Sequence, residues 1–157
     1  MHATPLPPAF RDGLDEFLRH AGDGSVEPPA ALADFLAKEK EQTFQQTLWD
    51  FIRRDGRPES EIYGAAGLTP SRFSRIRSDR EYRPDKITAI SLAIALRLSL
   101  RNTEELLAAA GFVLSSSNPA DLIVRYCLDN GITDVYRIND ALFTYRQPLV
   151  CGVVYED

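Results

Sequence analysis

The sequence predicts an all-α protein, and three observations support this prediction. Apolar residues recur at helical spacing in most segments of the chain, and capping residues precede several of these segments. Residues 86–98 are apolar nearly all round, as expected of a helix buried at the centre of a domain. Residues 58–78 carry apolar positions on both sides of a glycine, as expected of two short helices joined by a tight turn.

Composition limits the class of protein. The chain has 157 residues, enough for one domain with or without an appendage, and its hydrophobic content of 44% supports a packed core. No apolar run reaches the ~18 residues of a membrane span, and the N-terminus lacks a secretion pattern. We therefore expect a cytoplasmic protein with no membrane partner. Cys127 and Cys151 are too few and too far apart for a disulfide framework or a zinc site, and we expect no metal or cofactor.

The N-terminal region, residues 1–42, is predicted to be an arm outside the main domain. It combines a proline-rich start (1–9, expected to be partly disordered), an amphipathic helix (10–20), a linker rich in Gly, Ser and Pro (21–29) and a second helix (30–42). The arm carries no recognisable chemistry. We expect it to cover the core or to dock on a protein partner.

Residues 43–112 are predicted to be the main domain. A helix over 43–54 begins with a capping-box pair and stops at an Asp-Gly step. The buried central helix covers 86–98. A further helix covers 102–111, with Asn102 as its cap and a glycine at its end.

Residues 113–157 are predicted to be a helical extension and a possible dimerisation element. Helices are expected over 118–130, which opens with Asn-Pro, and over 133–145, which carries an amphipathic stripe. The final segment, 149–157, is apolar and β-branched, and it is too short to stand alone. Either the domain covers it or a second copy pairs with it.

The most informative stretch is residues 58–78. Gly67 suits the left-handed residue that ends one helix and turns the chain sharply. Thr69 can cap the second helix, and Pro70 fits its first position because that N–H has no helical partner. The second helix, 70–78, then presents small polar and arginine side chains away from its apolar side. Such a face is what the major groove of DNA accepts.

Basic charge is concentrated at and just after this second helix. The formal net charge of the whole chain is −5, which on its face argues against nucleic acid. Residues 72–86, however, carry six basic and three acidic side chains. Phosphate binding depends on such local patches, although a solvated face with balanced charges explains the same pattern.

The order and spacing of the segments from 43 to 111 resemble the lambda-repressor-like, Cro/XRE-type helix-turn-helix family. The motif residues that carry the resemblance are Ile62, Gly67, Leu68, Phe73 and Ile76, and residues 87–98 and 104–112 extend it. It covers roughly 70 of the 157 residues. The segment that follows looks like an extension found in some bacterial proteins of this family. The resemblance implies a five-helix DNA-binding core flanked by the N-terminal arm and the C-terminal extension.

Carried over by position, the resemblance implies base-facing roles for Ser71, Ser74 and Arg75, and phosphate contacts from Thr69, the helix ends and the basic loop. From the residues themselves, Arg72 and Arg75 are the best candidates to read bases, because a guanidinium can bond guanine O6 and N7 together. The predicted DNA-binding set is Thr69, Ser71, Arg72, Ser74, Arg75, Arg77, Arg80, Arg83 and Lys86.

This set predicts a DNA-binding transcriptional regulator, most simply a repressor that occludes a promoter, with double-stranded DNA and a second copy of the chain as partners. The alternative is a non-catalytic adaptor or antitoxin-like module that binds protein on the same scaffold. The overall acidity favours this alternative, as do Tyr63, at a position where the family usually has a small residue, and the Glu59/Glu61 pair. We expect no enzymatic activity, because both histidines lie in the arm and no Ser/His/Asp arrangement can be argued.

Overall fold

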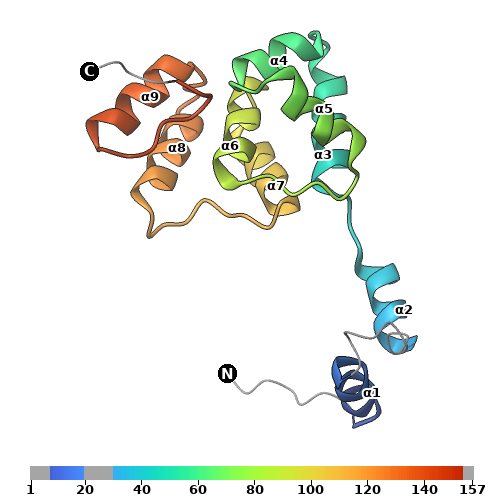
Figure 1. The fold of residues 1–157 in the computed structure, drawn as a ribbon. Helices are drawn as coiled ribbons and strands as arrows, with labels where there is room; N and C mark the ends of the chain where they lie inside the picture. The colour runs from blue at the N-terminus through green and yellow to red at the C-terminus, as the bar shows by residue number, and fades with distance from the viewer. Residues whose placement is uncertain (1–7, 20–29, 154–157) are drawn as a thin grey trace. The chain divides into compact units, whose positions relative to one another are not determined.

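The computed structural model describes residues 8–19 and 30–153, and all regular secondary structure among them is helical (Figure 1). The all-α prediction is therefore confirmed for this part of the chain. The chain divides into two compact units, residues 1–41 and residues 42–157. The extension predicted over 113–157 thus belongs to the same compact unit as the predicted main domain.

The first unit contains α1 (Pro8–Arg19) and α2 (Ala30–Glu39). These two helices confirm the amphipathic helix predicted over 10–20 and the second helix predicted over 30–42. No residue of α2 is buried. The linker predicted over 21–29 lies outside the described residues. Most of the segment 1–9, predicted to be partly disordered, lies outside them as well, and its last two residues form the start of α1.

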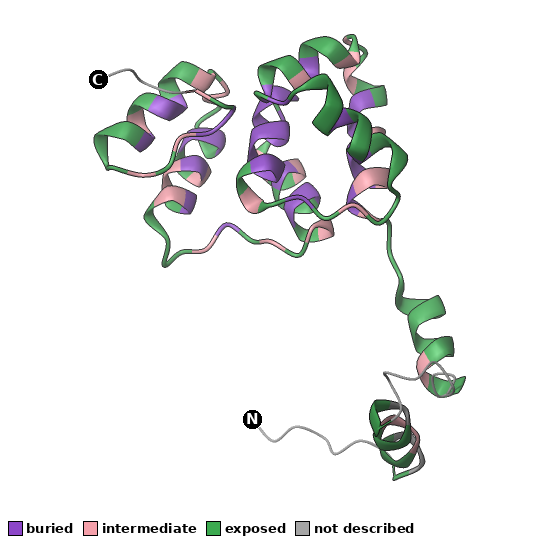
Figure 2. Ribbon diagram, viewed as in Figure 1, coloured by how far each residue is buried: buried purple, intermediate pink, exposed green. Residues whose placement is uncertain are grey.

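The second unit is built around a buried helix. Its helices are α3 (Phe44–Asp55), α4 (Glu59–Ala65), α5 (Pro70–Ser78), α6 (Lys86–Ala95), α7 (Leu100–Ala109), α8 (Pro119–Asp129) and α9 (Val135–Thr144). Every residue of α6 from Thr88 onward is buried, and Figure 2 shows this concentration of buried residues. α6 packs against α4 and α7, α3 packs against α7, and α8 packs against α7 and α9. The prediction of a buried central helix is confirmed.

Local capping determines where several helices begin. Thr43 and Gln46 form the expected capping box of α3: the Thr43 hydroxyl accepts from the Gln46 N–H at 3.3 Å, and the Gln46 carboxamide accepts from the Thr43 N–H at 3.0 Å. Asn118 caps α8 as expected, because its side-chain oxygen accepts from the Ala120 N–H at 2.9 Å. These polar side chains satisfy donors that the first helical turn leaves unpaired.

The predicted boundary between the central helix and its successor is wrong. α6 ends at Ala95 rather than at residue 98, because Arg97 adopts a left-handed conformation with φ 53°. The next helix begins at Leu100, and its cap is Ser99, whose hydroxyl accepts from the Asn102 N–H at 3.2 Å. Asn102 was expected to be the cap, but Ser99 stands closer to the end of α6 and takes that role.

Candidate nucleic-acid interface

α4 and α5 are joined by the tight turn that the sequence indicates. Gly67 has φ 71°, and the Leu68 N–H donates to the Tyr63 carbonyl at 2.9 Å across the end of α4. Ile62 on α4, and Phe73 and Ile76 on α5, are buried beneath this turn. The two helices are therefore held together by an apolar inner side, which leaves the opposite side of α5 in solvent.

Both ends of α5 are fixed by hydrogen bonds. The Thr69 hydroxyl accepts from the Arg72 N–H at 3.2 Å, and Pro70 occupies the first helical position. At the other end, the Gln45 carboxamide on α3 donates to the Arg77 carbonyl at 2.6 Å. These contacts fix the orientation of α5 on the domain, so its outward side chains project from a rigid element.

An aromatic layer supports α5 from below. The Phe73 ring stacks on the Trp49 ring of α3, with their centroids 5.5 Å apart. It also packs at a tilt against the Tyr63 ring of α4, with a centroid distance of 5.0 Å. Tyr63 thus packs against the apolar side of α5. This contact explains how a large residue fits the position where a small one was expected, because the Tyr63 ring contributes to the layer between the two helices.

Two cations of the predicted set are engaged within the domain. Arg77 pairs with Glu59 of α4 and lies over the Trp49 ring, 5.8 Å from its centroid. Lys86 is half-buried and pairs with the buried carboxylate of Asp121 on α8 at 2.5 Å. Their charges are compensated by these partners, so neither is placed as a free phosphate ligand.

Arg72 is partly engaged. Its guanidinium donates to the Thr88 hydroxyl at 3.2 Å and lies 3.9 Å from the Asp85 carboxylate, while about half of the side chain stays exposed, at 49%. Both partners belong to the start of α6, so Arg72 connects α5 to the central helix.

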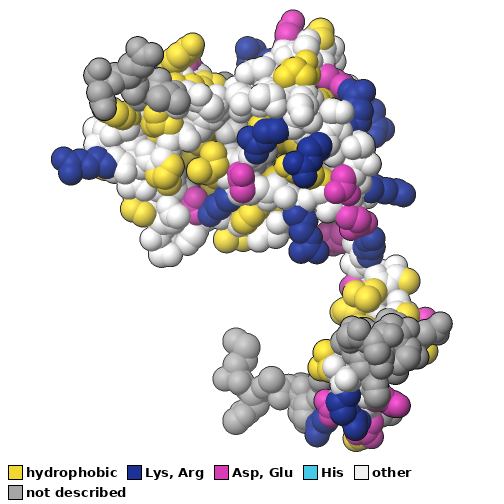
Figure 3. Space-filling view, in the orientation of Figure 1, with side chains coloured by type: hydrophobic (Ala, Val, Ile, Leu, Met, Phe, Trp, Pro, Cys, Tyr) yellow, Lys and Arg dark blue, Asp and Glu magenta, His cyan; other side chains and the backbone are white. Residues whose placement is uncertain are grey.

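Three arginines of the set have no such partner. Arg75 on α5, and Arg80 and Arg83 in the following segment, are exposed, and the described residues offer their guanidinium groups no hydrogen bond or ion pair. Ser71 and Ser74 are exposed on α5 beside Arg75. On the face seen in Figure 3, Lys and Arg side chains gather over α5 and its flanking segments, with Asp and Glu among them. Within the predicted set, the cations without a partner among the described residues are therefore these three arginines.

The C-terminal segment packs against the α4–α5 turn. The Cys151 N–H donates to the Ser91 hydroxyl of α6 at 2.8 Å, and a Cβ on Gly67 would lie 2.6 Å from the Gly152 nitrogen. Val150 exchanges two hydrogen bonds with the buried Asn139 side chain, at 2.9 and 3.0 Å. Val150 and Cys151 are buried, and burial raises the pKa of the Cys151 thiol to about 11. The segment was expected to be covered either by the domain or by a second copy. In its described part, the domain covers Val150 and Cys151.

The connection that precedes α4 is fixed by a carboxylate–guanidinium pair. The Arg57 guanidinium donates to the Asp55 carboxylate at 2.7 and 2.9 Å and to the Ala95 carbonyl at the end of α6 at 2.7 Å. The hydrogen bond from Arg57 lowers the pKa of Asp55, against the opposing effect of burial. This pair connects the end of α3 to the end of α6 and so helps to position α4.

Sequence reasoning missed the side chains that hold the extension on the domain. Asp121 looked like an ordinary acidic residue in a first helical turn, and Asn139 and Ser91 stood in amphipathic or apolar patterns without any distinguishing feature. Their partners lie far away in the sequence, so no local pattern indicates these contacts.

Comparisons with known protein families, with curated proteins and with solved structures find no match to this chain. None of the described helices has the length and apolar character that a membrane crossing requires. The described residues contain no group of three or more His, Cys, Asp or Glu side chains placed to hold a metal ion.

Proposed function

We propose that this protein binds double-stranded DNA through α5 and acts as a transcriptional regulator, in the simplest case a repressor that occludes a promoter. One observation carries the proposal: Arg75, Arg80 and Arg83 are exposed, and residues 8–19 and 30–153 offer them no ion pair, on and next to a helix whose other side is fixed to the domain. The resemblance of the motif to Cro/XRE-type helix-turn-helix domains supports the same function.

The proposal divides the exposed residues by role. Arg75 reads a base, with Ser71 and Ser74 beside it, because all three lie on the outward side of α5 and a guanidinium can form two hydrogen bonds to guanine. Arg80 and Arg83 hold phosphates, since they follow the helix in a charged segment and form no competing ion pair with the part of the chain that the structure describes. Thr69 acts mainly as the cap of α5, and Arg77 and Lys86 act mainly within the domain.

The negative net charge fits this proposal when the pairing of the charges is considered. Glu59 is the acidic residue of α4 that pairs with Arg77, so its repulsion of a phosphate is reduced. Long-range repulsion from the rest of the acidic chain is screened beyond about 8 Å at physiological salt. Arg75, Arg80 and Arg83 then supply positive charge on and next to α5, where a DNA backbone would meet the domain.

Arg75→Ala tests this function directly. Selection from a random duplex library gives the preferred site, and gel-shift titration of the variant on that site is expected to show a loss of about 1–3 kcal/mol, with relaxed preference at one base pair. Arg101→Ala is the matched control, because Arg101 is an exposed arginine on α7 whose side chain forms no hydrogen bond or ion pair with the described residues. Equal loss in both variants, or no loss in either, contradicts a base-reading role for Arg75.

The second candidate is a protein-binding adaptor or antitoxin-like module on the same scaffold. It is favoured by the formal net charge of −5. Under this function neither Arg75→Ala nor its control changes DNA binding, because the wild type binds neither specific nor random duplexes at low salt. The same titrations therefore separate the two functions.

A further inference from the structure

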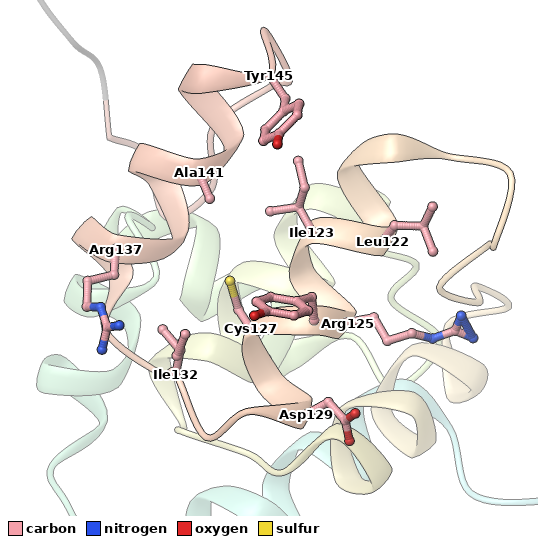
Figure 4. Close-up of a pocket in the computed structure, with 10 residues that line it drawn as sticks. Leu122, Ile123, Arg125, Cys127, Asp129, Ile132, Arg137, Ala141 and Tyr145 are labelled. Atoms are coloured by element: carbon pink, nitrogen blue, oxygen red, sulfur yellow. The ribbon is translucent and has the colours of Figure 1, made fainter.

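A groove lies between α8 and α9. Its volume is about 740 Å³, within the range of about 300–1,000 Å³ that is usual for small-molecule sites. Figure 4 shows the residues that line it, and most of them are apolar or aromatic. Tyr126 and Tyr145 line the groove and are each 67% exposed, so a molecule bound there covers rings that otherwise stay in water. An exposed apolar surface of this kind marks an interaction site.

The two ends of the groove differ in chemistry. Arg137, Ala141 and Tyr145 follow one another at intervals of four residues, so they lie along one side of α9 and its end, over about 12 Å. Figure 4 shows Ile132 on the side of Arg137 and Ile123 on the side of Tyr145. The groove therefore has a guanidinium at one end, and an apolar stretch leads from it to an aromatic ring at the other.

The charges along the groove favour an anion. Arg125, Arg137 and Asp129 are its charged lining residues within the described part of the chain. Arg125 donates to the neutral Ser116 hydroxyl at 3.1 Å and so keeps its charge. The side chain of Arg137 is exposed and forms no hydrogen bond or ion pair with the described residues. In Figure 4 the Asp129 carboxylate points away from Arg137, which leaves the Arg137 end of the groove positive.

The charge of Arg137 reaches the inner wall of the groove. Cys127 lines the groove and is buried. Burial raises the pKa of its thiol, and the positive charge of Arg137 opposes this effect by favouring the thiolate. An anionic group bound at this end meets the same attraction, whereas a cationic group is repelled.

These features restrict the chemistry of the occupant. A fully apolar molecule removes water from Arg137 without giving it a partner, which costs free energy. A nucleotide or a sugar needs several hydrogen-bond partners, whereas the described lining of the groove is mainly apolar. A molecule with one carboxylate on an apolar body meets both requirements, because a carboxylate forms strong hydrogen bonds with a guanidinium and the body covers the apolar stretch.

We propose that the α8–α9 groove binds a small amphipathic acid, with one carboxylate on an apolar body, as in a medium-chain fatty acid. The carboxylate accepts hydrogen bonds from the Arg137 guanidinium. The apolar body lies over Ile132 and Ala141 towards Ile123, and the Tyr145 ring packs against its far end. The residues of this site belong to α8, α9 and the loop between them, so the inference does not depend on DNA binding by α5.

Isothermal titration calorimetry of the full chain with decanoate tests the site. Decanoate, kept below the concentration at which it forms micelles, is expected to bind at a single site per chain. Decylamine has the same tail with a positive head, and acetate has the carboxylate without the tail. Each is expected to bind at least about tenfold more weakly than decanoate. Equal affinities for decanoate and decylamine overturn the proposal, because the guanidinium then selects no charge.

Variants test whether decanoate binds in the groove. Arg137→Gln keeps a long polar side chain without the charge, and it is expected to weaken decanoate binding about tenfold. Arg101→Gln is the matched control, because Arg101 is exposed on α7 and does not line the groove, so its decanoate affinity stays unchanged. Ala141→Trp fills the groove and is expected to abolish binding, and circular dichroism checks that this variant is folded.

The proposal is overturned by a wild type that does not bind decanoate. It is also overturned if Arg137→Gln binds as tightly as the wild type, or if a folded Ala141→Trp still binds, because decanoate then lies elsewhere. A second copy of the chain in the groove gives a further contrary result: decanoate does not bind, and Tyr126→Asp lowers the mass measured by sedimentation. No DNA is present in these experiments, so their outcome is distinguishable from a failure of DNA binding by α5.

Discussion

Gly67→Ala is expected to destabilise the domain far more than the same change at another left-handed glycine. Gly67 has φ 71° and Gly111 has φ 82°, so alanine pays the left-handed strain of about 1 kcal/mol at both positions. At Gly111 the added Cβ meets nothing within 4 Å. At Gly67 it would lie 2.6 Å from the Gly152 nitrogen and also overlap the Cys151 carbonyl, well inside a contact distance of about 3.5 Å.

The structure sets the size of this difference. The domain can relieve the overlap by shifting backbone, which costs about 1–3 kcal/mol for an overpacked site. It can instead release the C-terminal segment. This release breaks the Cys151–Ser91 hydrogen bond and the two Asn139–Val150 hydrogen bonds, each of which contributes about 1 kcal/mol, and it also exposes Val150 to solvent. The backbone shift is the smaller cost. Gly67→Ala is therefore expected to lose about 2–4 kcal/mol in total, against about 1 kcal/mol for Gly111→Ala.

Urea unfolding followed by helical circular dichroism measures both variants. The midpoint of Gly67→Ala should fall well below that of Gly111→Ala, with an unchanged dependence on denaturant, because the native state stays compact. Equal midpoints for the two variants would refute the reasoning, since they would show that the C-terminal segment does not press on the turn between α4 and α5.

Two further predictions concern charged pairs. Asp55→Asn is expected to cost about 1–2 kcal/mol at neutral pH, because it weakens the bonds from Arg57. Because the folded-state pKa of Asp55 is lowered, the wild type loses the stability contributed by this pair as the pH falls below about 4. Urea midpoints across an acid pH series should show this contribution being lost in the wild type but not in Asp55→Asn. Lys86→Met is expected to lower the free energy of unfolding by about 2–4 kcal/mol, because it leaves the buried Asp121 carboxylate without its cation. The salt dependence of DNA binding is expected to stay unchanged. A reduced salt slope would instead place Lys86 on a phosphate.

Local sequence was sufficient to predict α5 and its surroundings. Thr69, Pro70 and Gly67 act within a few residues of their own positions, and the apolar spacing of Phe73 and Ile76 fixes which side of the helix is buried. Caps and short-range periodicity depend on neighbours in the chain, so they can be recognised from the sequence. The same local reasoning went wrong at Asn102, where Ser99 offered a competing cap three residues earlier.

Pairings across the fold were not predictable. Lys86 and Asp121 are 35 residues apart, and Cys151 and Ser91 are 60 residues apart. Nothing in a single sequence indicates that a lysine in a basic loop will meet a buried carboxylate, so Lys86 was assigned to DNA with its neighbours. The candidate site is therefore smaller than the predicted set, because three-dimensional pairing removes cations that the sequence counts as free.

The salt dependence of DNA binding tests the central claim most directly. Fluorescence anisotropy of a labelled random duplex, titrated with wild-type protein over a series of salt concentrations, gives the slope of log affinity against log salt. We expect measurable binding at low salt with a steep slope, and a slope smaller by about one unit in each of Arg80→Ala and Arg83→Ala but not in Arg101→Ala. A wild type that binds no duplex at low salt, or variants that share its slope, would contradict DNA binding through this face.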